Sequence, residues 1–168
     1  MKELWEPPSG EDRTIYEWSP FLRHHLSKEN LLALTLDQFK EVCRRVHAMR
    51  DHAIRVDNQT FGLPKDTPKK ERDECIELLA TYLWNQRSEN GKTVLDAIHF
   101  VLRGGPGQDL PRRLWEATHS SVWRIPHLGI SSLGELVGWA MPDKFPPRNG
   151  RTSKALMALG NKVTIHTE

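Results

Sequence analysis

Residues 35–54 read TLDQFKEVCRRVHAMRDHAI, and the spacing of the apolar side chains in this stretch decides the fold class. The side chains that face one way recur every three or four positions, which is the period of an α-helix with one buried face. The stripe consists of Leu36, Phe39, Cys43, Val46, Arg50 and Ala53, broadened by Val42, Met49 and Ile54. Thr35 with Gln38 three residues later is a capping-box pattern. The stretch therefore predicts one long helix from Thr35 to just before Asn58.

Helical signals continue along the chain. Thr67 and Pro68 have the residue types of an N-cap and a first helical position, and they predict the start of a second long helix. Thr93 with Asp96 caps a third, which Gly104–Gly107 ends. Shorter helices are expected over 20–26, from Pro111, from a Ser132/Glu135 capping box, and from Thr152 to Leu159, with one short strand at Val163–His166.

These elements predict an all-α protein, built as a small helical bundle with a helix-hairpin-helix-like C-terminal subdomain. We expect an N-terminal helical layer over residues 1–103 and a basic C-terminal subdomain over 108–168, packed as one globular unit. The glycines and proline of 104–107 are the candidate hinge between them.

Length and composition exclude several classes. A chain of 168 residues with 38% hydrophobic side chains suits one domain. Because no apolar run approaches about 18 residues, we expect no membrane span, and the polar first 20 residues predict no secretory signal. Cys43 and Cys75 are too few for a disulfide scaffold, and both fall on apolar helical stripes, which predicts buried thiols. A reducing, cytoplasmic location is expected.

Charge is distributed unevenly along the chain. Residues 1–84 carry 13 basic and 15 acidic side chains, whereas residues 85–168 carry 11 and 7, so a net charge of +2 hides a basic second half. Between Asp143 and Glu168 there is no acidic residue. Such a stretch can attract a polyanion, and it can equally be a solvated tail.

No catalytic or cofactor motif stands out, so no catalytic residue, metal or cofactor is predicted. The sequence Gly91-Lys92-Thr93 lacks the earlier glycine of a phosphate-binding loop, and a helix cap explains it. The histidines do not have metal-site spacing. His47 and Asp51 are expected to pair on a helix surface. The cations of the first long helix are expected to form a charge-mixed surface: Lys40, Arg44, Arg45, Arg50 and Arg55.

The turn Leu128-Gly129-Ile130 lies between two expected short helices. A glycine there allows backbone N–H groups to approach a phosphate, as in a helix-hairpin-helix, although Ser131 stands where the second glycine of that motif belongs. Ser131 can still offer a hydroxyl at a helix N-terminus. The alternative is a plain turn glycine.

The loop Arg148-Asn149-Gly150-Arg151, capped by Thr152, is the second candidate. An Asn-Gly turn would direct both arginines outward beside a helix N-terminus, which suits phosphate contact and base-edge reading. Lys154 follows on the expected helix. Pairing of the arginines with Asp143 or Glu135 is the structural alternative.

Aromatic composition points to the same region. Six of the aromatic residues are tryptophan, and Trp123 precedes Arg124 close to the glycine turn. A tryptophan beside basic loops can stack on an unpaired base, or it can pack in the core. We therefore expect nucleic-acid contact from these residues: Trp123, Arg124, Ser131, Arg148, Asn149, Arg151 and Lys154.

The segments Trp123–Trp139, Pro142–Leu156 and Ala158–Gly160 resemble a region of bacterial anti-phage and restriction-associated proteins. From about Thr35 onward the chain is similar to amino-terminal regions that precede AAA+ motor domains of the McrBC type. The resemblance implies a domain that reads DNA, often modified DNA, beside a motor that hydrolyses GTP or ATP. The chain has no Walker motif, so the motor would lie elsewhere. Because these domains differ in fold, the resemblance assigns no base-reading residue.

The sequence thus predicts a DNA-binding recognition module of a bacterial restriction or antiviral defence system, non-catalytic by itself, whose partners are DNA and an AAA+ motor. Two alternatives stay open. One is a protein-interaction adaptor of a multi-subunit complex. The other is a small helix-hairpin-helix DNA-repair-type enzyme, for which Asp143 and Lys144 are the nearby candidates.

Overall fold

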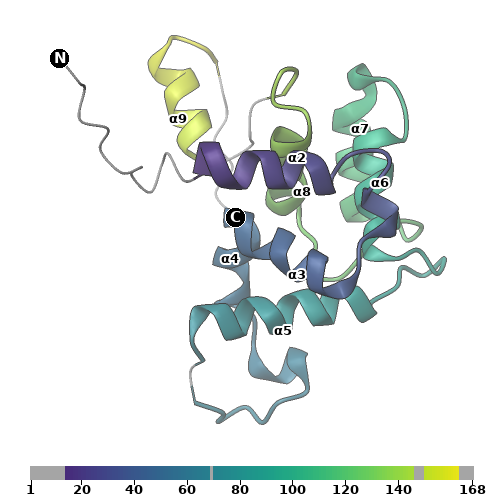
Figure 1. The fold of residues 1–168 in the computed structure, drawn as a ribbon, viewed down its shortest axis with the longest axis vertical. Coiled ribbons are helices and arrows are strands. Elements are labelled where there is room, and N and C mark those ends of the chain that lie inside the picture. The colour runs from purple at the N-terminus through teal and green to yellow at the C-terminus, as the bar shows by residue number, and fades with distance from the viewer. Residues whose placement is uncertain (1–13, 69, 146–149, 163–168) are drawn as a thin grey trace.

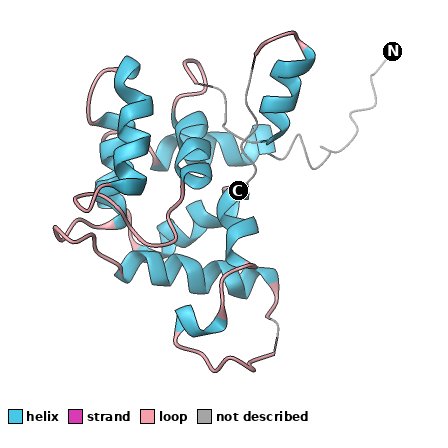
Figure 2. Ribbon diagram, turned by 180° about the vertical axis from the view of Figure 1, so that it is seen from behind, coloured by secondary structure: helices cyan, strands magenta, loops and turns pink. Residues whose placement is uncertain are grey.

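The computed structural model describes residues 14–68, 70–145 and 150–162, and these ranges contain helices and loops but no β-strand (Figures 1 and 2). The all-α class is confirmed. The α-helices are α2 (Ser19–His25), α3 (Leu36–Arg45), α4 (His47–Ala53), α5 (Arg72–Asn85), α6 (Val94–Arg103), α7 (Leu110–His119), α8 (Ile130–Ala140) and α9 (Gly150–Ala158). Single turns of other helix types are η1 (Thr14–Trp18), η2 (Leu31–Ala33), η3 (Asn58–Phe61) and η4 (Gly107–Asp109). The expected strand at Val163–His166 lies outside the described residues.

Helix α8 is the centre of the fold. Every residue from Ser132 to Gly138 is buried, and the helix contacts α2, α4, α6 and α7. Its sequence is apolar on most sides, which is typical of a helix surrounded by others. Gly134 and Gly138 are four residues apart on one face of the helix, and both are buried.

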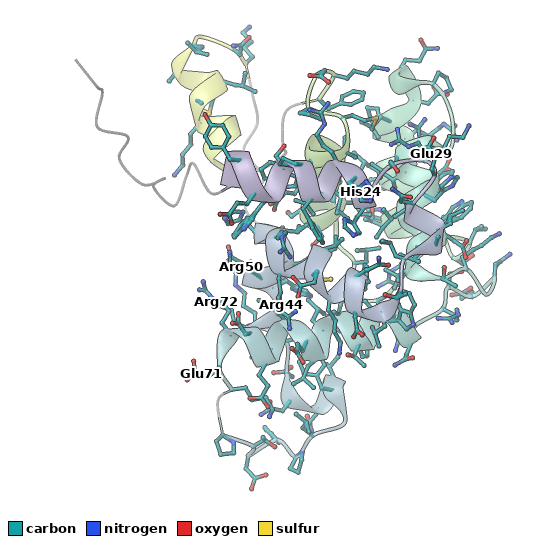
Figure 3. All side chains as sticks on the ribbon, in the orientation of Figure 1. His24, Glu29, Arg44, Arg50, Glu71 and Arg72 are labelled. Carbon is teal, nitrogen blue, oxygen red and sulfur yellow. The ribbon has the colours of Figure 1, made fainter. Side chains whose placement is uncertain are left out.

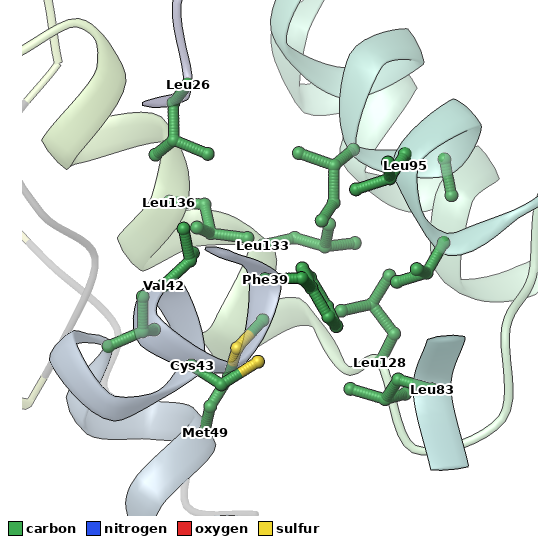
Figure 4. Close-up of a cluster of buried hydrophobic side chains, with 14 of the residues drawn as sticks. Leu26, Phe39, Val42, Cys43, Met49, Leu83, Leu95, Leu128, Leu133 and Leu136 are labelled. Atoms are coloured by element: carbon green, nitrogen blue, oxygen red, sulfur yellow. The ribbon is translucent and has the colours of Figure 1, made fainter. Parts of the chain in front are cut away.

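The core around α8 is one continuous cluster (Figure 4). Phe39 and Val42 of α3 and Leu83 of α5 meet Leu133 and Leu136 of α8 in this cluster. The two parts of the chain that the sequence separates at 104–107 therefore share a core. Helix α9 lies at the edge of the molecule beyond α2, and none of the buried core residues of the described chain comes from it.

Two capping boxes that the sequence predicts at helix N-termini are confirmed. Thr35 and Gln38 form a capping box at α3, where the Thr35 amide donates to Gln38 Oε1 at 2.9 Å. Thr93 and Asp96 do the same at α6, where the Thr93 amide donates to Asp96 Oδ2 at 2.8 Å. Both patterns depend only on neighbouring residues.

The prediction of one long helix from Thr35 is wrong. The helix divides at Val46, whose φ of −96° and ψ of 111° are extended rather than helical. The apolar stripe continues across the break because α3 and α4 both pack on α5. The break leaves the first amides of α4 without helical acceptors, and Glu135 accepts from two of them.

Three other predicted starts are also wrong. Helix α5 begins at Arg72, and the Thr67 hydroxyl donates to the Pro64 carbonyl at 2.6 Å within a preceding turn. Helix α8 begins at Ile130 with Gly129 as N-cap, so Ser132 lies inside it instead of forming a capping box with Glu135. Helix α9 begins at Gly150, which places Thr152 within it rather than at its cap.

The segment 104–107, expected to be a hinge, is tied to the core by Arg113 of α7. This side chain is 1% exposed, and it donates from Nε to the Val101 carbonyl at 3.0 Å and from Nη1 to the Pro106 carbonyl at 2.8 Å. The two bonds join the end of α6 to the approach to α7. Arg113 thus links both sides of the corner between α6 and α7.

Candidate functional site

One cavity of about 460 Å³ lies beside the first turns of α8 and is lined by several ionisable side chains. Helix α4, the end of α7, the loop 120–129 and the first turns of α8 form its walls. Its lining residues are His47, Ala48, Asp51, His52, Arg55, Thr118, Arg124, Ile125, His127, Leu128, Gly129, Ser131, Ser132 and Glu135. The volume is in the ordinary range of small-molecule sites.

Two imidazoles contact each other across this cavity. His52 Nε2 of α4 lies 3.2 Å from His127 Nδ1 of the loop, so one ring donates and the other accepts. His127 has a φ of 66°, a left-handed conformation that non-glycine residues rarely adopt. Its ring also makes a T-shaped contact with Tyr82 of α5, with an interplanar angle of 84° and the centroids 5.4 Å apart. The pair therefore joins the loop to α4 and α5.

Glu135 has a structural role at the same cavity. Its carboxylate accepts from the amides of His47 and Ala48, each at 2.8 Å, and from Trp139 Nε1 at 3.1 Å. Burial by itself raises the pKa of Glu135, but the hydrogen bonds from His47, Ala48 and Trp139 outweigh burial and hold the pKa below the ordinary carboxyl value. The carboxylate thus caps α4 and stays charged.

The observed partner of His47 differs from the one that the sequence predicts. Its Nδ1 lies 3.4 Å from Glu135 Oε1, and its ring is tilted against Trp18 with the centroids 5.5 Å apart. Among the described residues, no hydrogen bond or ion pair joins His47 to Asp51. The predicted surface pair of His47 and Asp51 is therefore wrong, and the carboxylate beside His47 is the buried Glu135.

The cavity also contains two exposed arginines from different elements. Arg55 follows α4, and Arg124 belongs to the loop 120–129. Neither forms an ion pair with a carboxylate in the part of the chain that the structure describes. Ser131 lies on the first turn of α8, and the N-cap Gly129 gives that turn no side-chain cap. This edge of the cavity is consequently rich in hydrogen-bond donors.

Other arginines of α3 and α4 are already engaged, as the charge-mixed interpretation expects. Arg44 and Arg50 are labelled in Figure 3. Arg44 pairs with Glu41 and with Glu77 of α5, and the guanidinium of Arg50 lies 5.4 Å from the Trp18 ring centroid. Arg55 differs from them because it opens onto the cavity.

The structure brings together only part of the predicted contact set. Arg124 and Ser131 line the same cavity. Lys154 is exposed on α9 and is not among the lining residues. Arg148 and Asn149, with the side chain of Arg151, lie outside the described residues.

Trp123 packs into the molecule. Its ring stacks on Phe100 of α6 with the centroids 4.2 Å apart and an interplanar angle of 2°, and Lys92 Nζ lies 5.3 Å from its centroid. It is partly buried against the core cluster. One face of the Trp123 ring therefore has a stacking partner inside the protein.

The candidates for repair-type chemistry lie elsewhere. Asp143 is exposed and pairs with Arg23 of α2 at 3.1 Å, and neither Asp143 nor Lys144 lines the cavity. Cys43 is fully buried, and burial raises the pKa of its thiol, as expected for a core residue. Within the described ranges, no group of three or more His, Cys, Asp or Glu side chains is placed to hold a metal ion.

Sequence reasoning missed Arg55, His52 and His127 as cavity residues. They come from two segments that only the tertiary fold brings together, so no spacing rule finds them. The one local signal is Pro126-His127-Leu128-Gly129, a turn sequence beside the predicted glycine turn.

Comparison with protein families, curated proteins and solved structures finds no match to this chain. Among the helices of the described residues, none has the length and apolar character needed to cross a bilayer. The function must therefore be argued from the site itself.

Proposed function

We propose that this protein is a non-catalytic DNA-binding module whose phosphate-contacting surface is the donor-rich edge of the cavity. One observation carries the proposal: Arg55 and Arg124, from distant segments, open onto one cavity at the N-terminal end of α8. Arginine forks and the first turn of a helix are the groups that bind phosphate oxygens most directly.

The charge distribution supports this choice. The second half of the chain is basic, and Arg124 belongs to it. The nearest buried carboxylate, Glu135, is occupied by the amides of α4 and by Trp139, so its charge is already compensated locally. Phosphate contacts of this kind position a protein on DNA without reading sequence.

The choice of DNA, and of a restriction or anti-phage system as the context, depends on the resemblance to regions that precede McrBC-type motor domains. On this proposal an AAA+ motor, on another chain or another part of the protein, supplies nucleotide hydrolysis. The module contributes recognition only.

Salt dependence of binding to a short DNA duplex tests the proposal by fluorescence anisotropy. Two phosphate contacts, one from each arginine, predict a log–log slope near −1.8, which is a roughly 12-fold loss of affinity between about 50 and 200 mM salt. Arg124→Ala and Arg55→Ala should each weaken binding and reduce the slope by about 1.

Arg87→Ala is the matched control. Arg87 is exposed and carries the same charge, but it lines a different cavity, with Leu32, Leu34 and Trp84 among its neighbours. This variant should leave the slope unchanged. A protein that binds no duplex even at the lowest salt would overturn the proposal and favour the adaptor alternative, with this second cavity as its candidate surface.

A further inference from the structure

We infer that the hydrogen bond between the rings of His52 and His127 holds Arg55 and Arg124 in a fixed relative position for contact with phosphates. We refer to this hydrogen bond as the histidine bridge. His52 and His127 are thus positioning residues, an assignment that rests on the DNA binding proposed above. The two ends of the bridge lie on the two segments that carry the arginines.

The first end of the histidine bridge is joined to Arg55 through the backbone. His52 lies in the last turn of α4, and the amide of Arg55 donates to the His52 carbonyl at 2.9 Å. The backbone of Arg55 is therefore held against the residue whose ring forms the bridge.

The second end of the histidine bridge is joined to Arg124 by a closed turn. His127 lies inside this turn, in which the Leu128 amide donates to the Ile125 carbonyl at 3.1 Å. Ile125 and Leu128 are buried, so the turn is anchored in the core. Arg124 directly precedes Ile125, and its own amide donates to the Ser120 carbonyl at 2.9 Å. Arg124 is therefore attached to one end of the turn that carries His127.

The backbone of His127 is in a conformation that needs support from its surroundings. A φ of 66° is unfavourable for a residue with a side chain, and it persists where neighbouring contacts fix it. The ring has such contacts on two helices, because it bonds to His52 of α4 at 3.2 Å and makes the T-shaped contact with Tyr82 of α5. The bridge is therefore one of the contacts that hold this turn in place.

A fixed spacing of the two arginines reduces the cost of binding. Ordering of segments and side chains during association lowers affinity, whereas a surface that already has its bound geometry avoids this loss. His52 and His127 are 75 residues apart in the sequence, so the bridge restrains two segments that are remote along the chain. We therefore expect the bridge to raise the affinity for DNA without adding a phosphate contact.

The test separates affinity from its salt dependence in the same duplex anisotropy assay. His52→Leu removes the bridge and keeps a helix-forming side chain. We expect its affinity to fall about 3- to 10-fold, a loss typical of a few groups that must be ordered on binding. The log–log slope should stay near −1.8, because both arginines still reach phosphates. His52→Gln carries an amide that can hydrogen-bond to His127, and it should keep most of the affinity.

His119→Leu is the matched control. His119 is an exposed histidine of α7 that does not line the cavity, so its loss should change neither the affinity nor the slope. Circular dichroism checks that each variant is folded.

A double-mutant cycle tests whether the two rings act through one hydrogen bond. His127→Gly removes the second ring and suits the positive φ at that position. We expect the double variant, His52→Leu with His127→Gly, to bind within about twofold of the weaker single variant. Losses that add in the double variant reject the bridge as their cause.

Three further outcomes overturn the inference. An unchanged affinity of His52→Leu rejects it while leaving the proposed DNA binding intact. A slope that falls by about 1 in His52→Leu replaces the positioning role with a direct phosphate contact of the imidazole. Failure of the parent protein to bind any duplex rejects both the inference and the proposed function.

Discussion

Glu135 connects two helices that are remote in sequence, because its carboxylate caps α4 from within α8. Its depressed pKa means that the charged form is favoured in the folded state relative to the unfolded state. The resulting stabilisation is present above the ordinary carboxyl pKa of about 4.3. It is lost as the pH falls through the lower pKa of the folded state.

We expect Glu135→Gln to lower the free energy of unfolding by about 1.5–3 kcal/mol near neutral pH, because charge-assisted hydrogen bonds are replaced by weaker ones. The difference from the parent protein should shrink below about pH 4, where the parent carboxylate itself takes up a proton. Urea denaturation at both pH values measures it. Glu29→Gln is the control, since Glu29 is exposed (Figure 3) and its change should stay within about 0.5 kcal/mol. A pH-independent difference would contradict the expected role.

Arg113 is a buried cation whose guanidinium group donates hydrogen bonds to backbone carbonyls. Arg113→Met keeps much of the volume but leaves the Val101 and Pro106 carbonyls without their donors. We expect a loss of about 3 kcal/mol in unfolding free energy. Arg112→Met, at the exposed neighbouring position paired with Glu116, should cost less than about 1 kcal/mol. Similar costs for the two variants would show that Arg113 does not fix the corner.

At the scale of elements, the corner between α6 and α7 depends on a glycine. A Cβ at Gly104 would lie 2.4 Å from the Phe100 carbonyl oxygen and 2.8 Å from Phe100 Cδ2. We expect Gly104→Ala to cost about 1–3 kcal/mol through this overlap. Gly129→Ala is the control, because nothing lies within 4 Å of a Cβ at that position. Thermal unfolding compares them, and an unchanged melting temperature for Gly104→Ala would show that the corner can relax.

Helix boundaries show which elements can be predicted from sequence. The capping boxes of α3 and α6 are local, so their residue types suffice. The break at Val46 cannot be found in the apolar stripe, because side chains on both sides of it face α5. The amides that the break exposes donate to Glu135, which the sequence alone assigns to a capping box in its own helix. In the folded protein, the carboxylate of Glu135 instead accepts hydrogen bonds from amides of α4, a tertiary contact that the local sequence pattern does not reveal.

At the scale of the whole molecule, the shared core predicts that residues 1–103 do not fold alone. This fragment lacks Leu128, Leu133 and Leu136, which fill the centre of the cluster (Figure 4). It also lacks the carboxylate that caps α4. We expect low helicity and strong binding of a hydrophobic dye for the fragment, against one cooperative transition for the full chain. A cooperative melt of the fragment near the melting temperature of the full chain would contradict this.

The candidate site could be predicted only in part. Arg124 and Ser131 were found because a glycine turn before a helix is a local signal. Arg55 and the histidines were missed because their importance comes from the packing of α4 against α8, which is a property of the assembled molecule. The basic residues near Trp123 in the sequence suggested that its ring could stack on a base. In the structure the ring stacks on Phe100 inside the protein.

The distance in sequence between α4 and its cap also sets an order of events during synthesis. His47 leaves the ribosome early, but Glu135, whose carboxylate accepts a hydrogen bond from the His47 amide, is translated 88 residues later. Because chains emerge N-terminus first, the wall formed by α4 is completed only after α8 has emerged and docked. A polypeptide whose translation stops before Glu135 would therefore display Arg55 without the completed cavity around it.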